Sequence, residues 1–281
     1  METVLGVIGG SGLYAMEALE KVAETIPETP FGQPSSPVVS GALGDHRVLF
    51  LARHGLGHVL APTQVNYRAN VYALKALGAT HLLSISAVGS LREELEPGHV
   101  LLPSQLLDRT TRRVSTFFDD GLVAHVAVAD PYCPFLSEVV ADAAEVTGAV
   151  VHRDKTYVCI EGPRFSTRAE SHAHRALGAD VVGMTAAPEA FLAREAELPY
   201  ATLALVTDYD CWRPREDVDV PSVLAIVRAN VARAKAIIAR VACRLPDARQ
   251  SPAHNALRYA IVSSGPIAPE LRRRYAALLA E

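Results

Sequence analysis

The sequence predicts an α/β fold: a single domain built on a twisted, mixed central β-sheet that is flanked by helices. Short apolar runs typical of strands alternate with longer amphipathic runs typical of helices along most of the 281 residues. The composition, 49% hydrophobic and 21% charged, is that of a globular protein whose core needs no disulfide or metal. We expect the domain to span residues 1–262 and a C-terminal helical tail to span residues 263–281.

The expected elements follow in a regular order. The first strand contains Val4, Leu5, Val7 and Ile8, and residues 25–37, rich in Pro, Gly and Ser, should form a loop. The later strands are expected at residues 48–52, 82–86, 99–102, 156–160 and 201–207, and the helices at 65–77, 168–177, 188–197 and 222–245. Gly78 and Gly178 directly follow two of these helices, as glycine often does at a helix C-terminus. A shorter helix is expected after Pro246 and Pro252, and the arginines at 272–274 should lie on a solvated helix face.

The charge and the cysteines exclude several classes of protein. A net charge of −4 at pH 7 lacks the excess of Lys and Arg typical of nucleic-acid-binding proteins. The four cysteines, Cys133, Cys159, Cys211 and Cys243, form no C-x-x-C pair, which indicates a reduced protein rather than a disulfide scaffold. No apolar run resembles a signal peptide or is long enough to cross a bilayer. We expect a soluble, cytoplasmic protein without nucleic-acid or membrane partners.

The glycine-rich turn after the first strand could bind either of two kinds of phosphate. Residues 10–15 (GSGLYA) match the G-x-G-x-x-A pattern of dinucleotide-binding proteins. That fold also needs an acidic residue at the end of a second strand about twenty residues further on. Residues 26–30 (IPETP) form a proline-broken stretch there instead. We therefore reject a dinucleotide cofactor and expect a free oxyanion.

Further polar residues follow other predicted strands. Arg53 and His54 come directly after residues 48–52, and Ser86 and Ala87 come at the end of residues 82–86. Ligands of open α/β sheets bind beyond the carboxyl ends of the strands, so these turns should converge. Hydroxyls, backbone N–H groups and a guanidinium together suit a tetrahedral oxyanion. The alternative for Arg53, a surface ion pair, is equally compatible with the spacing.

Two carboxylates follow the apolar strand at residues 201–206. Asp208 and Asp210 should lie at the same edge of the sheet, where partial burial would raise a carboxyl pKa and leave a proton to donate. The alternative is that an aspartate there caps a turn. The sequence has no G-x-S-x-G nucleophile elbow. A metal site is not expected, because glycines surround His54 and His58, and residues 172 and 174 would face apart on a helix.

Taken in order, these segments resemble the family of trimeric purine nucleoside phosphorylases and methylthioadenosine phosphorylases. The resemblance runs from about residue 5 to residue 262 and rests on VIGGSGLY, LARHG, PTQVNYRANVYALKALGATH, SAVGSLREEL, DRTTRR, DPYCP, IEGPRFSTRAE, GMTAAPE and TDYDCW. It implies a homotrimer that uses no cofactor and in which inorganic phosphate attacks C1′ of a purine nucleoside.

The resemblance also assigns roles to residues. It implies a phosphate site at Ser11, Arg53, His54, Ser86, Ala87 and Thr185. It implies that Asp208 protonates purine N7, that Asp210 accepts a hydrogen bond from the 6-amino group, and that Phe165 and Ser166 lie beside the base. Met184 would contact the ribose, and His125 of a neighbouring subunit, with Val220 and Val223, would line the pocket for the 5′ substituent.

The leading expectation is phosphorolysis of 5′-methylthioadenosine to adenine and 5-methylthioribose 1-phosphate, in methionine and purine salvage. A phosphorylase for another 5′-substituted adenosine, such as a 5′-halogenated one, is an alternative. The methylthio group and a halogen are both small and weakly polar, so the sequence distinguishes the two substrates poorly. A 6-oxopurine nucleoside or methylthioinosine phosphorylase is another, because Gly183 stands where adenine-specific relatives have Asn. Outside the class, a non-catalytic nucleoside-binding protein stays open.

Overall fold

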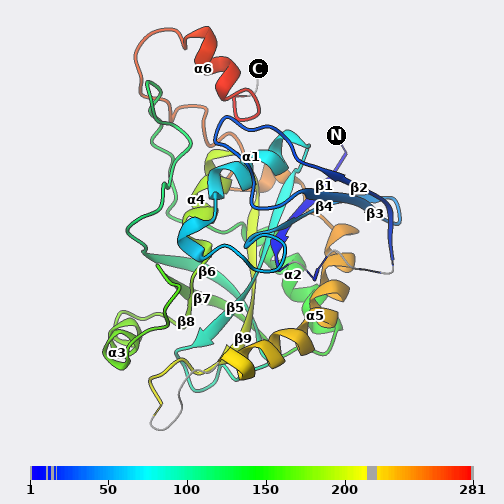
Figure 1. Cartoon of the computed structure of the whole chain (residues 1–281), viewed down its shortest axis with the longest axis vertical. Helices are drawn as coiled ribbons and strands as arrows, with labels where there is room; N and C mark the ends of the chain where they lie inside the picture. Colours follow the sequence, from blue (N-terminus) through cyan, green and yellow to red (C-terminus); the bar gives the residue numbers. More distant parts are fainter. Residues whose placement is uncertain (1, 11, 14–15, 17, 214–219, 280–281) are drawn as a thin grey trace.

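The computed structural model describes residues 2–10, 12–13, 16, 18–213 and 220–279 (Figure 1). Within these residues nine strands form one sheet in the order β2-β3-β4-β1-β5-β8-β7-β6-β9. The strands are β1 (Val4–Gly9), β2 (Leu19–Thr25), β3 (Val38–Leu43), β4 (His46–Ala52), β5 (His81–Ser90), β6 (Val100–Arg109), β7 (Val151–Ile160), β8 (Val181–Gly183) and β9 (Tyr200–Asp208). The helices are α1 (Tyr67–Ala76), α2 (Pro134–Val146), α3 (Arg168–Ala176), α4 (Ala186–Glu195), α5 (Val220–Ala242) and α6 (Pro269–Arg274), with short 3₁₀ turns at Pro62–Gln64 and Ala248–Gln250.

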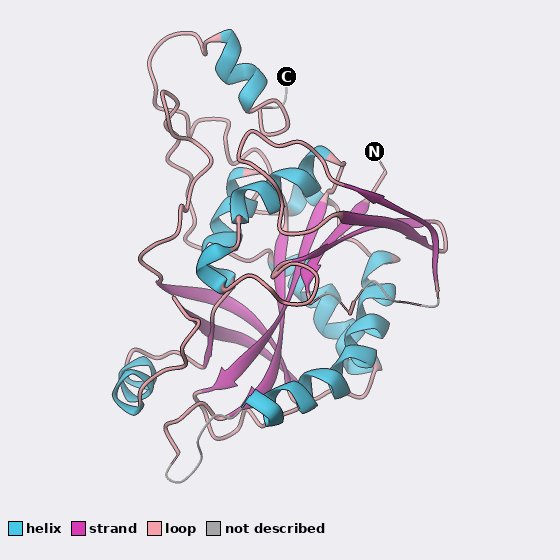
Figure 2. Ribbon diagram, viewed as in Figure 1, coloured by secondary structure: helices cyan, strands magenta, loops and turns pink. Residues whose placement is uncertain are grey.

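The sheet is mixed and partly closed. Strand β1 pairs in parallel with β4 and β5, and β5 pairs in parallel with β9, so four strands point the same way. Strand β9 also pairs with β6, and this second pairing closes β5, β8, β7, β6 and β9 into a ring (Figure 2). The hairpin β3–β4 and the edge strand β2 extend the sheet on the other side of β1.

Helices cover both faces of the sheet, as the α/β prediction requires (Figure 1). Strand β1 shows why: Val4 and Ile8 enter one core cluster, while Leu5 and Val7 enter another. Side chains of a strand alternate between faces, so a run that is apolar at every position predicts a strand buried on both sides. Helices α1 and α4 pack together over the first face, and α2 and α5 over the second.

Most of the expected elements are confirmed. The five later strands lie within β4, β5, β6, β7 and β9, apart from His99, which precedes β6, and the four helices correspond to α1, α3, α4 and α5 with ends shifted by a few residues. Two expectations are wrong in part: residue 25 ends β2 rather than starting a loop, and the segment after Pro246 forms a 3₁₀ turn and a series of turns rather than a regular helix. Strands β2, β3 and β8 and helix α2 were not predicted from the sequence.

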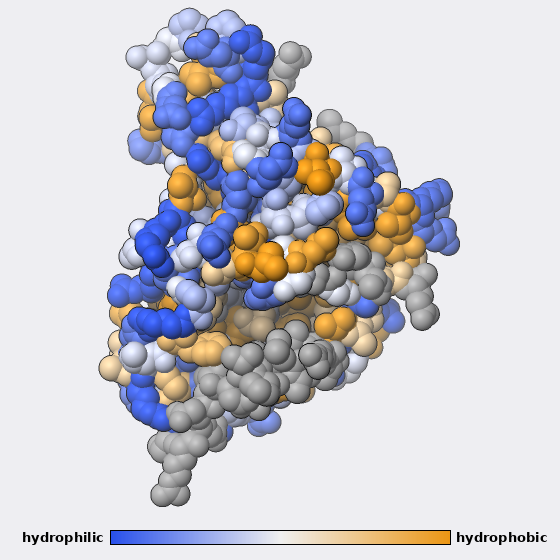
Figure 3. Space-filling model, viewed as in Figure 1, coloured by the Kyte–Doolittle hydropathy of each residue, from blue (hydrophilic) through white to orange (hydrophobic). Residues whose placement is uncertain are grey.

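The C-terminal segment packs onto the rest of the fold. Tyr275 is fully buried and donates a hydrogen bond to the Asp119 carbonyl oxygen (2.9 Å). Arg274 forms ion pairs with Asp119 and Asp120, so the prediction of a solvated arginine face holds for residues 272 and 273 but is wrong for Arg274. Hydrophilic side chains dominate the outside of this segment, at the top of Figure 3. In the described part of the chain, no helix is both long and apolar enough to cross a membrane.

Candidate active site

The ends of β1, β4 and β9 lie at one edge of the sheet, because these strands run parallel with β5. The predicted turn at Ser86 and Ala87 is wrong, because both residues lie within β5, which continues to Ser90. Gly9 is the register partner of Ala52, and Gly89 is the register partner of Asp208. Directly after β4, the Arg53 N–H donates to the Gly9 carbonyl oxygen (3.0 Å), which ties the end of β4 to the end of β1. Mid-strand Ala87 is exposed, so the strand backbone is accessible at this point.

Arg53 is buried, with 2% of its surface exposed, so the alternative of a surface ion pair is wrong. Its Nε donates to Glu189 (2.9 Å) and its Nη2 donates to Ser84 Oγ (2.7 Å). Burial opposes the charge of the guanidinium, but the adjacent Glu189 carboxylate more than offsets this and raises the pKa of Arg53. Glu189 belongs to the GMTAAPE segment, yet nothing in the sequence indicates that it pairs with a residue 136 positions away.

His54 is a neutral imidazole. Burial, and then the charge of Arg53, lower its pKa to about 4, while the contact of Nδ1 with the Leu60 carbonyl oxygen (2.9 Å) acts the other way. At neutral pH, Nδ1 therefore donates to that carbonyl and Nε2 carries no proton. The ring stacks on His58 with centroids 4.4 Å apart. Among the described residues no group of three or more His, Cys, Asp or Glu side chains could hold a metal ion.

Several polar atoms at the site lack a partner within the described residues. They include Ser86 Oγ and Thr185 Oγ1 from the predicted phosphate site, and Ser166 Oγ and Asp210 Oδ2 from the predicted base site. Buried polar atoms are almost always hydrogen-bonded, because leaving one unpaired costs about 1–3 kcal/mol. These four atoms therefore keep hydrogen-bonding capacity for a polar ligand.

Asp208 and Asp210 lie side by side in different environments. Asp208 Oδ1 accepts from the Asp210 N–H (2.7 Å) and Oδ2 accepts from the Thr207 hydroxyl (2.7 Å). Burial raises the pKa of Asp208; the two hydrogen bonds oppose this rise, and the Asp210 carboxylate adds to it. A Cβ at position 89 would lie 2.9 Å from Asp208 Oδ1, so Gly89 allows the carboxylate to approach the neighbouring strand.

Arg113 fixes the loop that carries Met184 and Thr185, a role that the sequence analysis missed. Its Nη1 donates to the carbonyl oxygen of Met184 (2.8 Å), and its Nε pairs with Glu161 (3.1 Å). The side chain of Arg113 is 2% exposed. The DRTTRR segment contains three arginines, and no sequence signal separates the buried one from its neighbours.

Two of the predicted site residues are exposed. Phe165 is 41% exposed, and His125 lies on an exposed segment where its N–H donates to the Ala260 carbonyl oxygen (2.8 Å). Ser11 and the side chains of Val220 and Val223 lie outside the described residues.

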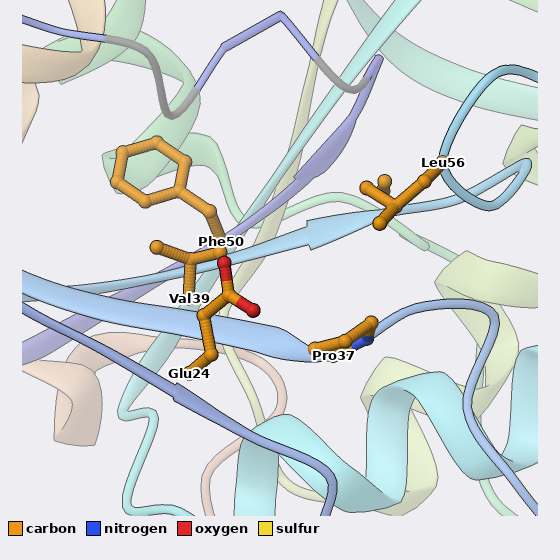
Figure 4. A pocket seen from close by; sticks show the side chains of 6 residues that line it. Glu24, Pro37, Val39, Phe50 and Leu56 are labelled. Atoms are coloured by element: carbon orange, nitrogen blue, oxygen red, sulfur yellow. The ribbon is translucent and has the colours of Figure 1, made fainter.

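Two surface hollows lie apart from the predicted site residues. Figure 4 shows a cavity of about 10 Å³, lined by Glu24, Pro37, Val39, Phe50 and Leu56, which has room for no more than about one water molecule. A larger hollow of about 420 Å³ lies between residues 97–99, residues 148–150 and α5. Neither includes a predicted site residue, so the candidate site is defined by the strand ends rather than by these hollows.

The chain belongs to the phosphorylase superfamily, whose family model matches residues 4–242. The S-methyl-5′-thioadenosine phosphorylase of Geobacter sulfurreducens is 54% identical over 265 residues, which are 94% of this chain and 93% of the relative. A methylthioadenosine phosphorylase sourced from an Antarctic soil metagenomic library superposes with a TM-score of 0.94 at 47% identity, covering 99% of each chain. A mutant of the Schistosoma mansoni adenosine/methylthioadenosine phosphorylase, in complex with methylthioadenosine, superposes with a TM-score of 0.80 at 40% identity over 86% of this chain and 91% of that one.

Proposed function

We propose that this chain catalyses the phosphate-dependent phosphorolysis of S-methyl-5′-thioadenosine, which yields adenine and 5-methylthioribose 1-phosphate for salvage in the cytoplasm. The observation that carries the proposal is the pair Asp208–Asp210 at the sheet edge, beside buried hydroxyls that lack partners within the described residues. The names of the similar proteins from Geobacter sulfurreducens and the Antarctic soil library support the same nucleoside.

Inorganic phosphate is the second substrate in this proposal, and no cofactor is required. Ser11, Arg53, His54, Ser86, Ala87 and Thr185 hold it. The described features that support this assignment are the unpaired Ser86 and Thr185 hydroxyls and the buried charge of Arg53. Arg53 pairs with Glu189 of α4, the helix whose N-terminal end follows Thr185.

In the reaction, a phosphate oxygen forms a bond to C1′ while the bond from C1′ to purine N9 breaks and its electron pair goes to the base. Asp208 donates its proton to N7 of the departing purine, and the raised pKa of Asp208 favours the protonated acid. The bound phosphate stabilises the positive charge that develops on the ribose ring. Holding both substrates together removes much of the entropic cost of their encounter.

Asp210 selects the base. Its Oδ2 is buried and has no hydrogen-bond partner within the described residues, so it is placed to accept from the 6-amino group of adenine. A 6-oxo group offers an acceptor and would face a carboxylate that has no proton to donate. Ser166 supplies a second polar contact and Phe165 an aromatic one.

The ribose lies against Met184, and a neighbouring subunit completes the 5′ pocket by contributing His125 beside Val220 and Val223. We assign a homotrimer for this reason. Apolar side chains flank the exposed His125. Val123 is 44% exposed, and Val262, whose N–H donates to the Val123 carbonyl oxygen, is 55% exposed. Apolar surface next to a predicted shared site favours subunit contact.

The test is purine release from methylthioadenosine, adenosine, inosine, methylthioinosine and 5′-fluoro-5′-deoxyadenosine, with and without phosphate. We expect adenine release that requires phosphate and is fastest with methylthioadenosine. Release that does not depend on phosphate would refute the phosphorylase assignment. Faster release from the halogenated nucleoside would change the physiological substrate and keep the chemistry.

Asp210→Asn tests the assignment of the base. It replaces the acceptor with an amide that can also donate to a 6-oxo group, so kcat/KM for methylthioadenosine should fall about 10–100-fold relative to methylthioinosine. The ratio of the two kcat/KM values is the measurement. An unchanged ratio would contradict the role of Asp210.

A further inference from the structure

Three buried hydroxyls from different parts of the fold meet beside Gly183. Ser86 comes from β5, Tyr157 from β7 and Thr185 from the loop after β8. Each hydroxyl oxygen is buried, and none makes a hydrogen bond of full geometry within the described residues. Ser86 and Thr185 already belong to the proposed phosphate site, whereas Tyr157 has no assigned role.

The close approach of Tyr157 depends on the absence of a side chain at position 183. Strands β7 and β8 are paired so that Tyr157 faces Val181 and Cys159 faces Gly183. A Cβ on residue 183 would lie 2.0 Å from the Tyr157 hydroxyl oxygen and 2.6 Å from Cζ. These separations are impossible between real atoms, so the phenol occupies the space that any other residue at 183 would need.

The phenol is a hydrogen-bond donor under working conditions. Burial raises the pKa of Tyr157 to about 12, and hydrogen bonding to the Thr185 and Ser86 hydroxyls and to the Thr185 backbone acts in the opposite direction, so the Tyr157 hydroxyl lies within hydrogen-bonding reach of both. A neutral phenol can donate to an anion. Three hydroxyls that can each turn a proton toward the same point are suited to an oxyanion.

We propose that the Tyr157 hydroxyl is a further phosphate-binding group, acting with those of Ser86 and Thr185, and that residue 183 is glycine to make room for it. This inference rests on the proposed phosphate site. Under this inference Gly183 is no argument for a 6-oxopurine substrate, because the glycine makes room for a phosphate-binding group while Asp210 contacts the base.

The direct test is Tyr157→Phe, which removes only the hydroxyl. We expect the Kd for inorganic phosphate, measured by calorimetry, and the KM for phosphate to rise about 10–100-fold. The KM for the nucleoside and the ratio of adenine to hypoxanthine release should stay unchanged. Tyr132→Phe is the matched control, because Tyr132 is also a buried tyrosine and its hydroxyl faces Thr202 rather than Ser86 and Thr185.

Unchanged phosphate affinity in Tyr157→Phe would overturn the inference, and so would an equal loss in Tyr132→Phe. Wild-type protein that neither binds phosphate nor requires it would instead refute the proposed function, so the two failures are distinguishable.

The role of Gly183 is tested with a double-mutant cycle. Gly183→Ala should weaken phosphate binding strongly in the wild-type background and only slightly in Tyr157→Leu, where the atoms that would clash are gone. A shift of base preference in Gly183→Ala, with phosphate affinity retained, would contradict the inference.

Discussion

Asp208 and Asp210 are two residues apart, yet their surroundings prepare them for opposite tasks. Both oxygens of Asp208 accept hydrogen bonds from its own strand end, whereas Asp210 keeps one oxygen buried and unpaired within the described residues. Asp210 also has φ = 52°, a left-handed conformation that Asp tolerates better than most residues. The turn therefore separates a buried carboxyl with a raised pKa, the proton donor of the proposed reaction, from a carboxylate oxygen that is buried and unpaired within the described residues.

Asp208→Asn tests the proton donor. The amide keeps the shape of the side chain but cannot protonate N7, so kcat should fall about 10²–10⁴-fold while the Kd for the nucleoside changes little. The measurements are purine release at saturating substrates and calorimetric binding. Asp45→Asn, at an exposed turn, is the control and should leave kcat unchanged.

The raised pKa of Asp208 also predicts how kcat and the free energy of unfolding depend on pH in wild type and in Asp208→Asn. Because burial raises the pKa of folded Asp208, its protonated form is favoured, and its contribution to stability is present at low pH and lost as the pH rises through that pKa. Wild-type kcat should fall over the same range at saturating phosphate. Asp208→Asn should lack this fall, and its free energy of unfolding should exceed that of wild type at neutral pH but not at acid pH. An identical alkaline fall in both proteins would assign it to another group.

At the scale of elements, the local sequence pattern predicted those strands and helices whose buried positions are visible in the order of apolar and polar residues. Strand β1 was recognised as a short apolar run buried on both faces, and the described apolar positions of α5 were recognised because they repeat at the helix period. Strand β2 was missed because all of its residues after Leu19 are exposed, so it shows no alternation. The closing of β9 onto both β5 and β6 is a long-range pairing that no local pattern encodes.

The same limit applied to the site. Arg53 and Asp208 were predictable because parallel strands bring their ends to one edge, whereas Ser86 lies within β5 rather than at its end. Their partners were not, since Glu189 and Arg113 come from helices and loops far away in sequence. Gly183 was noticed as a departure, but its reason lies in Tyr157 on the neighbouring strand.

Arg113→Lys tests whether this long-range anchoring matters for function. A lysine cannot make the forked set of bonds to Met184, Glu161 and Tyr67, so the free energy of unfolding should fall by about 2 kcal/mol. The KM for the nucleoside should rise, because the loop bearing Met184 loses its anchor. Urea denaturation and initial rates measure the two effects. Exposed Arg112→Lys is the control, and equal effects in both variants would contradict an anchoring role.

At the scale of the whole molecule, the C-terminal segment holds the part of the chain that carries His125. Tyr275 and Arg274 bind Asp119, while the backbone of residues 260–262 bonds to Val123 and His125. Tyr275 also packs against Phe31 and Phe118. The described residues between 119 and 126 are thus fixed from one side while His125 stays exposed, which is the arrangement needed to present it to another subunit.

A mixed-subunit experiment tests that presentation. If His125 acts in a neighbouring subunit, co-expressed His125→Ala and Asp208→Asn chains form trimers in which an intact Asp208 can face an intact His125. Around a closed three-fold ring, about one third of the sites in every mixed trimer should then be native. Trimers purified through a different tag on each chain should regain activity at low methylthioadenosine, where a damaged 5′ pocket limits the rate. If His125 instead acted within its own chain, every site would lack one of the two residues, and mixing would restore nothing.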